Sequence, residues 1–108
     1  MTQNILELAT ITLASGSTEE ELLAASKTFQ TEFLDHQSGF IRRDMIRRGD
    51  GTYLDVILWE SQNHADAVLT NAQSSKAVGQ YFDHMDMNPE KPEMGVEHCT
   101  LLARFSKD

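Results

Sequence analysis

The spacing of hydrophobic and polar positions changes several times along the chain. Apolar and β-branched residues alternate loosely from Ile5 to Leu13, which predicts a first strand. The spacing then becomes helical between Thr18 and about His36, with a stripe that we expect to be buried, formed by Leu22, Ala25, Phe29 and Phe33. Thr18-Glu19-Glu20-Glu21 has the form of a capping box, and its acidic residues suit the positive end of a helix dipole.

A hairpin is predicted between Gly39 and Ser61. Two strand-like runs are separated by Gly49-Asp50-Gly51, which supplies the glycines that a tight connection needs. Ser61 follows Trp59-Glu60 in the position of a helix N-cap. The hairpin therefore leads directly into the next helix.

The second half of the chain predicts two short helices and a strand. The first helix is marked by Ala65, Val68, Leu69 and Ala72, and the second, capped by Ser74 or Ser75, by Val78, Tyr81, Phe82 and Met85. Met87 to Gly95 contains two prolines and is expected to be a loop, and Val96 to Phe105 is the expected last strand. The resulting order is that of a ferredoxin-like α+β fold, with a four-stranded antiparallel sheet in a single domain over residues 1–108.

The third predicted strand has two different faces. Tyr53, Asp55, Ile57 and Trp59 share one of them, while the other is purely aliphatic, with Leu54, Val56 and Leu58. We expect the aliphatic face to meet the helices and the face of Tyr53 and Trp59 to remain open. Because monomers rarely expose such a patch, this predicts a two-fold symmetric homodimer with its sheets packed face to face.

Charge and composition narrow the choice of partners. Nine basic and seventeen acidic residues give a net charge of -8, which disfavours nucleic acid and anionic membrane surfaces as partners. The lone Cys99 cannot form an intrachain disulfide, and the N-terminal residues lack the basic start of a signal peptide and the long apolar run of a membrane span. A cytoplasmic location is therefore expected.

Several residues resemble a known family. Gly39-Phe40 at the start of the second strand, and the Tyr53-x-Asp55-x-x-x-Trp59-x-Ser61 run into an Ala-rich helix, resemble the antibiotic biosynthesis monooxygenase-like family, over Ile5 to Phe105. The resemblance implies a dimeric α+β barrel that encloses cavities. Some members oxidise phenols or quinols with molecular oxygen and no metal or flavin, and others degrade haem.

The haem-degrading branch fits this sequence poorly. That branch uses an asparagine on the first strand, and a tryptophan and a histidine on the helical region after the third strand. The corresponding positions fall at Glu7 and near Leu69 and Gly79. The cofactor-free branch, which relies on polar and aromatic side chains that line the cavity, is therefore preferred.

Candidate site residues lie on all four strands. Trp59, the only tryptophan, either fills core volume or forms a cavity wall on which a flat substrate stacks. Charged residues expected to converge nearby are Glu7, Arg42 or Arg43, Asp44, Asp55 and His98. They form either a structural ion-pair network in the dimer interface or the machinery that deprotonates a phenol or anthrone and holds the oxyanion.

The second interpretation predicts a role for each of these residues. His98 is the preferred base, because a histidine titrates near neutrality, with Asp55 and Arg43 as the other catalytic candidates. The predicted substrate-binding residues are Trp59, Tyr53, Glu7, Arg42 and Met45. No metal site is predicted, since Asp83, His84 and Asp86 match no standard ligand spacing, and no cofactor is expected.

The predicted function is that of a small enzyme acting on a hydrophobic aromatic or quinol-type molecule, as a cofactor-independent monooxygenase. Two alternatives remain. One is an oxygen-independent isomerase, cyclase or decarboxylase that uses the same groups. The other is a dimeric module that binds a small molecule without catalysis.

Overall fold

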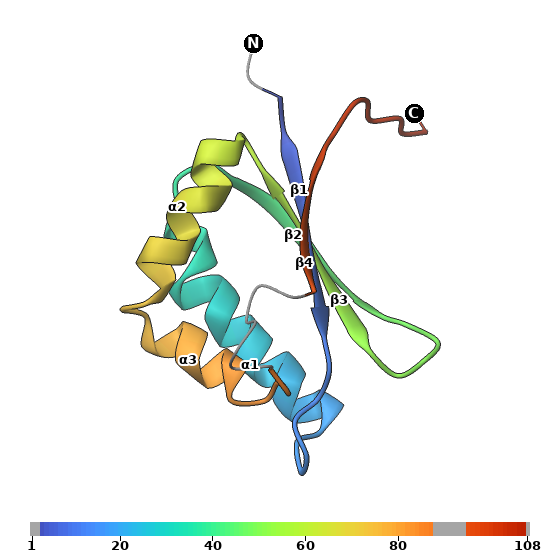
Figure 1. The fold of residues 1–108 in the computed structure, drawn as a ribbon, viewed down its shortest axis with the longest axis vertical. Helices are drawn as coiled ribbons and strands as arrows, with labels where there is room; N and C mark the ends of the chain where they lie inside the picture. The colour runs from blue at the N-terminus through green and yellow to red at the C-terminus, as the bar shows by residue number, and fades with distance from the viewer. Residues whose placement is uncertain (1–2, 88–94, 108) are drawn as a thin grey trace.

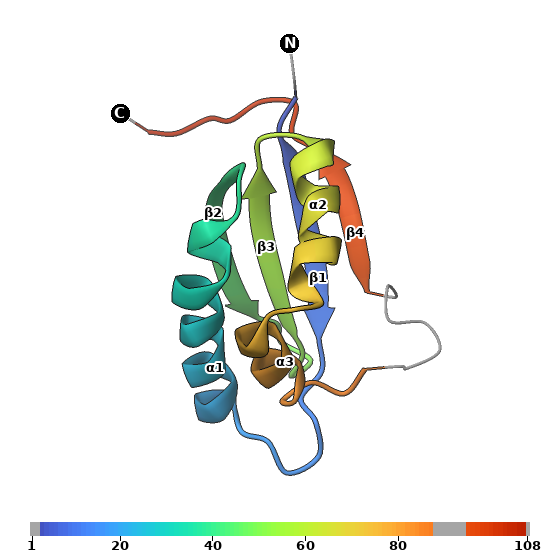
Figure 2. The ribbon, with the colours of Figure 1, turned by 90° about the vertical axis from the view of Figure 1, so that its left-hand side faces the viewer.

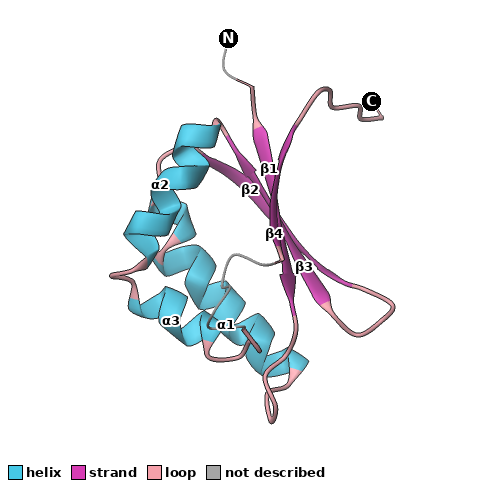
Figure 3. Ribbon diagram, viewed as in Figure 1, coloured by secondary structure: helices cyan, strands magenta, loops and turns pink. Residues whose placement is uncertain are grey.

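The computed structural model describes residues 3–87 and 95–107 and contains four strands and three α-helices (Figure 3). In chain order these are β1 (Ile5–Ile11), α1 (Glu19–Glu32), a 3₁₀ turn (Leu34–His36), β2 (Phe40–Arg47), β3 (Tyr53–Trp59), α2 (Gln62–Ala72), α3 (Lys76–Phe82) and β4 (Val96–Thr100). The predicted α+β fold with a four-stranded antiparallel sheet is confirmed. None of the helices in these described ranges has the length and apolar character to cross a membrane.

The strands lie in the order β2-β3-β1-β4, and all neighbouring pairs are antiparallel (Figure 2). The pairing of β2 with β3 contains one irregularity. Phe40 lies opposite Trp59, but Arg42 lies opposite Leu58, so Ile41 is an extra residue, as in a β-bulge. From Arg42 onward the hairpin pairs without interruption, and Gly51, with a φ of 90°, supplies the left-handed residue of its turn.

Side-chain caps fix where the helices begin. The Thr18 hydroxyl accepts a hydrogen bond from the Glu21 amide, while the Glu21 carboxylate accepts one from the Thr18 amide, which completes the predicted capping box. Ser61 caps α2 and Ser75 caps α3 in the same general way. The sequence therefore predicted all three helix starts.

The helices cover one face of the sheet and leave the other uncovered (Figure 1). The side chains of β3 that meet the helices are Tyr53, Asp55, Ile57 and Trp59, and the three apolar ones belong to the same core cluster as Leu22, Phe29 and Tyr81. The prediction that Leu54, Val56 and Leu58 meet the helices is therefore wrong. An aliphatic strand face is typical of a core face, but here Arg43 from β2 and Tyr81 from α3 satisfy Asp55 inside the core.

The uncovered face carries the aliphatic side chains instead. The register places Leu6 opposite Leu58 and Leu8 opposite Val56 on this face. Arg42 and Asp44 belong to the same face and form an exposed ion pair. Leu58 is already only 2% exposed, while Leu6, Leu8 and Val56 are partly exposed, so the surface that a second copy would cover is formed by these three and the charged pair.

Three predicted boundaries differ from the structure. The first strand ends at Ile11 and not at Leu13. The α-helical part of α1 ends at Glu32, and a 3₁₀ turn carries the chain on to His36. The last strand ends at Thr100, not at Phe105, and residues 101–107 continue without regular structure. The predicted loop from Met87 to Gly95 lies mostly outside the described residues.

Candidate functional site

A charged network connects four elements in the layer between sheet and helices. The Asp55 carboxylate on β3 accepts from Arg43 Nε on β2 at 3.1 Å and from the Tyr81 hydroxyl on α3 at 2.7 Å. The Arg43 and Asp55 side chains are each only 5% exposed, so this is a buried ion pair. A buried pair of this kind requires that its remaining hydrogen-bonding groups be satisfied.

Arg43 meets this requirement in full. Besides Asp55, its guanidinium donates to the Ser26 carbonyl and the Gln30 side chain at 3.3 Å each, to the Ser26 hydroxyl, and to the Tyr81 hydroxyl at 2.9 Å. It also lies 5.0 Å above the centre of the Phe29 ring. All five guanidinium N–H groups are thus directed at protein acceptors, which leaves none for a ligand.

Sequence reasoning missed three members of this network, namely Ser26, Gln30 and Tyr81. Tyr81 was noted only as part of a helical stripe. Its pKa is strongly raised, first by burial and then by the Asp55 charge, so the phenol keeps its proton. A serine within the apolar stripe of the first predicted helix was the available signal, since a buried hydroxyl needs a partner.

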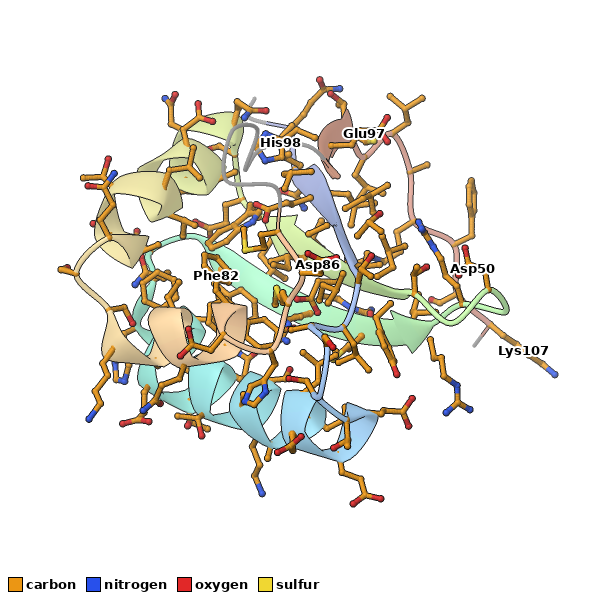
Figure 4. All side chains as sticks on the ribbon, turned by 60° about the horizontal axis from the view of Figure 1, so that its bottom comes forward. Asp50, Phe82, Asp86, Glu97, His98 and Lys107 are labelled. Atoms are coloured by element: carbon orange, nitrogen blue, oxygen red, sulfur yellow. The ribbon has the colours of Figure 1, made fainter. Side chains whose placement is uncertain are left out.

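A second polar cluster lies beside the first, where β1 meets β4. His98 is directly opposite Glu7 in the register, and its Nε2 is 3.4 Å from a Glu7 oxygen. Burial raises the pKa of Glu7, the neighbouring His98 offsets part of this increase, and the nearby Asp55 adds to it. Figure 4 shows His98 and Glu97, which are consecutive on β4, on opposite sides of the strand.

Trp59 closes this second cluster. Its side chain is fully buried and meets Phe40 edge-on, with ring centres 5.8 Å apart. The indole N–H approaches Glu7 closely enough to lower that pKa slightly, yet it completes no hydrogen bond with any acceptor in the described chain. A buried donor without a partner is rare in folded proteins and marks a place where an additional acceptor would be stabilised.

The predicted site residues therefore fall into separate groups. Glu7, Trp59 and His98 form the second cluster, and Asp55 and Arg43 belong to the network, where the Met45 sulfur is 4.0 Å from the Tyr81 hydroxyl.

Two predicted residues lie apart from both groups. Tyr53 is at the opposite end of β3 from Trp59, and its hydroxyl donates to Glu19 at 3.0 Å. Arg42 lies on the uncovered face of the sheet, so of the two arginines named as alternatives only Arg43 meets the helices. The assignment of Arg42 to substrate binding stays a prediction. Consecutive residues of a strand point to opposite faces, and therefore only one arginine of the pair can meet the helices.

Surface hollows in the described structure are small. One of about 270 Å³ lies between α1 and β2 and reaches the network at Ser26, Arg43 and Met45. Another of about 170 Å³ lies on the uncovered face and is lined by Leu6, Arg42, Val56 and Leu58 among others. Both fall below the roughly 300–1,000 Å³ that is usual for small-molecule sites.

Potential metal ligands do not cluster in residues 3–87 and 95–107. No three His, Cys, Asp or Glu side chains come together there in a way that would hold a metal ion. His84 instead shares a hydrogen bond with Ser17 at 3.1 Å.

Solved structures with the same fold come from several bacteria. SnoaB, a cofactor-independent oxygenase from Streptomyces nogalater, is 16% identical, with 97% of each chain covered and a TM-score of 0.66. A protein from Bordetella bronchiseptica, provisionally assigned as an antibiotic biosynthesis monooxygenase, is 16% identical over 94% of this chain and 100% of its own, with a TM-score of 0.74. A heme-degrading protein from Mycobacterium tuberculosis is 14% identical over 99% of this chain and all of its own, with a TM-score of 0.64.

No protein-family model and no curated protein sequence matches the chain. The evidence is therefore structural, and at such low identity it concerns the fold alone. The subunit fold expected from the resemblance is confirmed: the chain is built like the antibiotic biosynthesis monooxygenase-like proteins, over nearly its whole length. The dimeric barrel stays a prediction.

Proposed function

We propose that this protein is a cofactor-independent monooxygenase for a hydrophobic aromatic molecule that carries an ionisable hydroxyl group or an acidic C–H group, such as a quinol or an anthrone. The likeness in fold to a cofactor-independent oxygenase supports this class. The cluster of Glu7, His98 and Trp59 supports the site.

The observation that carries the proposal is the incomplete pairing of this cluster. Glu7 is a largely buried carboxylate with a raised pKa, and the indole N–H of Trp59 lies near it without completing a hydrogen bond to any of the described residues. A raised pKa makes a carboxylate a stronger base at neutral pH. An unpaired N–H provides a donor for the oxygen of a substrate anion. The cluster thus offers a proton acceptor and an anion-stabilising donor side by side.

The reaction then balances without a cofactor. The Glu7–His98 pair removes a proton from an activated CH₂ group, and the resulting carbanion transfers an electron to O₂. The two radicals combine to a peroxide, which takes back the proton, loses water and leaves a carbonyl group. The sum is R₂CH₂ + O₂ → R₂C=O + H₂O, in which the substrate carbon is oxidised and O₂ is reduced.

Dimer formation belongs to the same proposal. The uncovered face of the sheet presents aliphatic side chains beside the Arg42–Asp44 pair, whose N–O distance is 2.6 Å. In a two-fold symmetric interface, each arginine can meet the aspartate of the other copy. Such an arrangement buries the aliphatic residues and uses both charges.

A second candidate is a dimeric binding module without catalysis, which the Arg43–Asp55 network favours. Every donor of Arg43 is taken up by the protein, as expected of a structural ion pair. We infer that Arg43 and Asp55 hold the helices on the sheet, and their earlier assignment as catalytic residues stays a prediction.

Oxygen consumption by the purified protein, freed of metal and flavin, tests the proposal. We expect uptake above the buffer rate with at least one anthrone, naphthol or hydroquinone, and its loss in Glu7→Gln. The matched control is Glu97→Gln, which changes a neighbouring carboxylate on the opposite sheet face. Conversion of a substrate without oxygen uptake would favour the isomerase, cyclase or decarboxylase alternative. Binding without conversion would favour the module.

A further inference from the structure

We propose that Gln62 is a positioning residue that fixes the tautomer of His98, so that Glu7, and not His98, accepts the proton of the substrate. The part of this inference that concerns the tautomer of His98 is argued from geometry alone. The part that concerns Glu7 as the base rests on the proposed function.

The first step concerns the orientation of the Gln62 amide. Its Nε2 lies 2.8 Å from an oxygen of Asp66, one helical turn further along α2. A carboxylate only accepts hydrogen bonds, so the group that faces Asp66 is the NH₂ and not the carbonyl. Asp66 thus identifies the nitrogen of an amide whose two ends otherwise look alike.

The second step concerns the histidine. The same Gln62 Nε2 lies 2.9 Å from His98 Nδ1, and its second hydrogen is available for that contact. Since an NH₂ group donates, Nδ1 must be the nitrogen without a proton. The neutral ring then carries its proton on Nε2, which faces Glu7 at 3.4 Å.

The third step follows for Glu7. His98 Nε2–H donates toward the carboxylate, so the imidazole offers no free lone pair on that side. Its other lone pair is occupied by Gln62. The remaining basic atoms of the cluster are the Glu7 oxygens, which also lie near the unpartnered indole N–H of Trp59 and feel the charge of Asp55. His98 therefore orients the base and is not the base itself.

Nitrogen NMR of the imidazole rings tests the tautomer directly in the ¹⁵N-labelled protein. His98 is assigned by the loss of its signals in His98→Asn. At neutral pH we expect a protonated Nε2 and a bare Nδ1. In Gln62→Glu the new carboxylate accepts from Nδ1–H, and the tautomer should reverse. Gln62 is exposed at the first residue of α2, and His98 is exposed as well, so neither substitution removes core packing.

Two outcomes would overturn the inference: a protonated Nδ1 in the natural protein, or an unchanged tautomer in Gln62→Glu. This readout needs no substrate, so it is independent of the proposed function. If a substrate is turned over, kcat of Gln62→Glu should fall about 100-fold with KM nearly unchanged, at the lower end of the range of general acid–base effects. A kcat equal to that of the natural protein would contradict a positioning role even if the tautomer reverses.

Discussion

The Tyr81 hydroxyl lies 2.7 Å from the Asp55 carboxylate inside an otherwise apolar layer, and both groups also bind Arg43. This relationship connects α3 to the middle of the sheet. Since Ser26 brings in α1 through the same guanidinium, one charged network sets the positions of both helices. Its loss should affect the whole fold and not one surface.

Asp55→Ala should lower the free energy of unfolding by about 3–5 kcal/mol, because it leaves the Arg43 charge buried without its partner. Asp44→Ala is the matched control: it removes an aspartate from an exposed pair, on which an effect of about 0–1 kcal/mol is expected. Urea denaturation of both variants gives the comparison. Equal losses would show that the Arg43–Asp55 pair contributes no more than a surface contact.

Trp59→Ala should destabilise the subunit itself by roughly 3–5 kcal/mol, because the ring is fully buried in the core beneath the helices. Trp59→Phe should cost less, since it keeps an aromatic ring against Phe40 and removes an N–H that has no partner. Thermal unfolding at several protein concentrations measures both. A loss that disappears at high concentration would place the ring in a subunit interface instead.

The pKa of Glu7 predicts a pH dependence of stability. Burial raises this pKa above the ordinary value of 4.5, so the ionised form costs more in the folded than in the unfolded chain. The contribution of Glu7 to stability is therefore complete below about pH 4.5 and is lost as the pH rises through the folded pKa. The free energy of unfolding of Glu7→Gln, relative to the natural protein, should increase from about pH 4 to about pH 7. A constant or falling difference would contradict a raised pKa.

Val56→Glu should yield a folded monomer, since it places a charge in the centre of the uncovered aliphatic face. Sedimentation velocity and circular dichroism test this together. We expect a dimer for the natural protein and a monomer with unchanged helix content for the variant. A natural protein that is already monomeric at high concentration would exclude the proposed interface.

The order of elements was predictable because its signals are local. Capping residues, the helical stripe of Phe29 and the glycine turn of the hairpin each act over a few positions, and the structure contains them as expected. The alternation on β3 also grouped the correct residues, with Asp55 among Tyr53 and Trp59.

Whether that face of β3 turns toward the helices or away from them was not predictable from β3 alone. A carboxylate on a strand is typical of a polar face, and only partners on other elements turn that face into the core face. Those partners are Arg43 on β2 and Tyr81 on α3, which is 26 residues further along the chain. Which of Arg42 and Arg43 meets the helices likewise depends on a residue far along the chain, because Arg43 is held there by Asp55 on β3.

The division of charged residues between the two faces of β2 bears on how the hairpin avoids misfolding. If β2 moved by one position against β3, Asp44 would replace Met45 opposite Asp55, and Arg43 would leave the helices for the uncovered face. Two carboxylates would then share a layer poor in water, without the guanidinium that now neutralises one of them. The order Arg-Arg-Asp-Met thus destabilises the register that is shifted by one residue. A hairpin that forms in this register should therefore separate and pair again instead of persisting as a misfolded state.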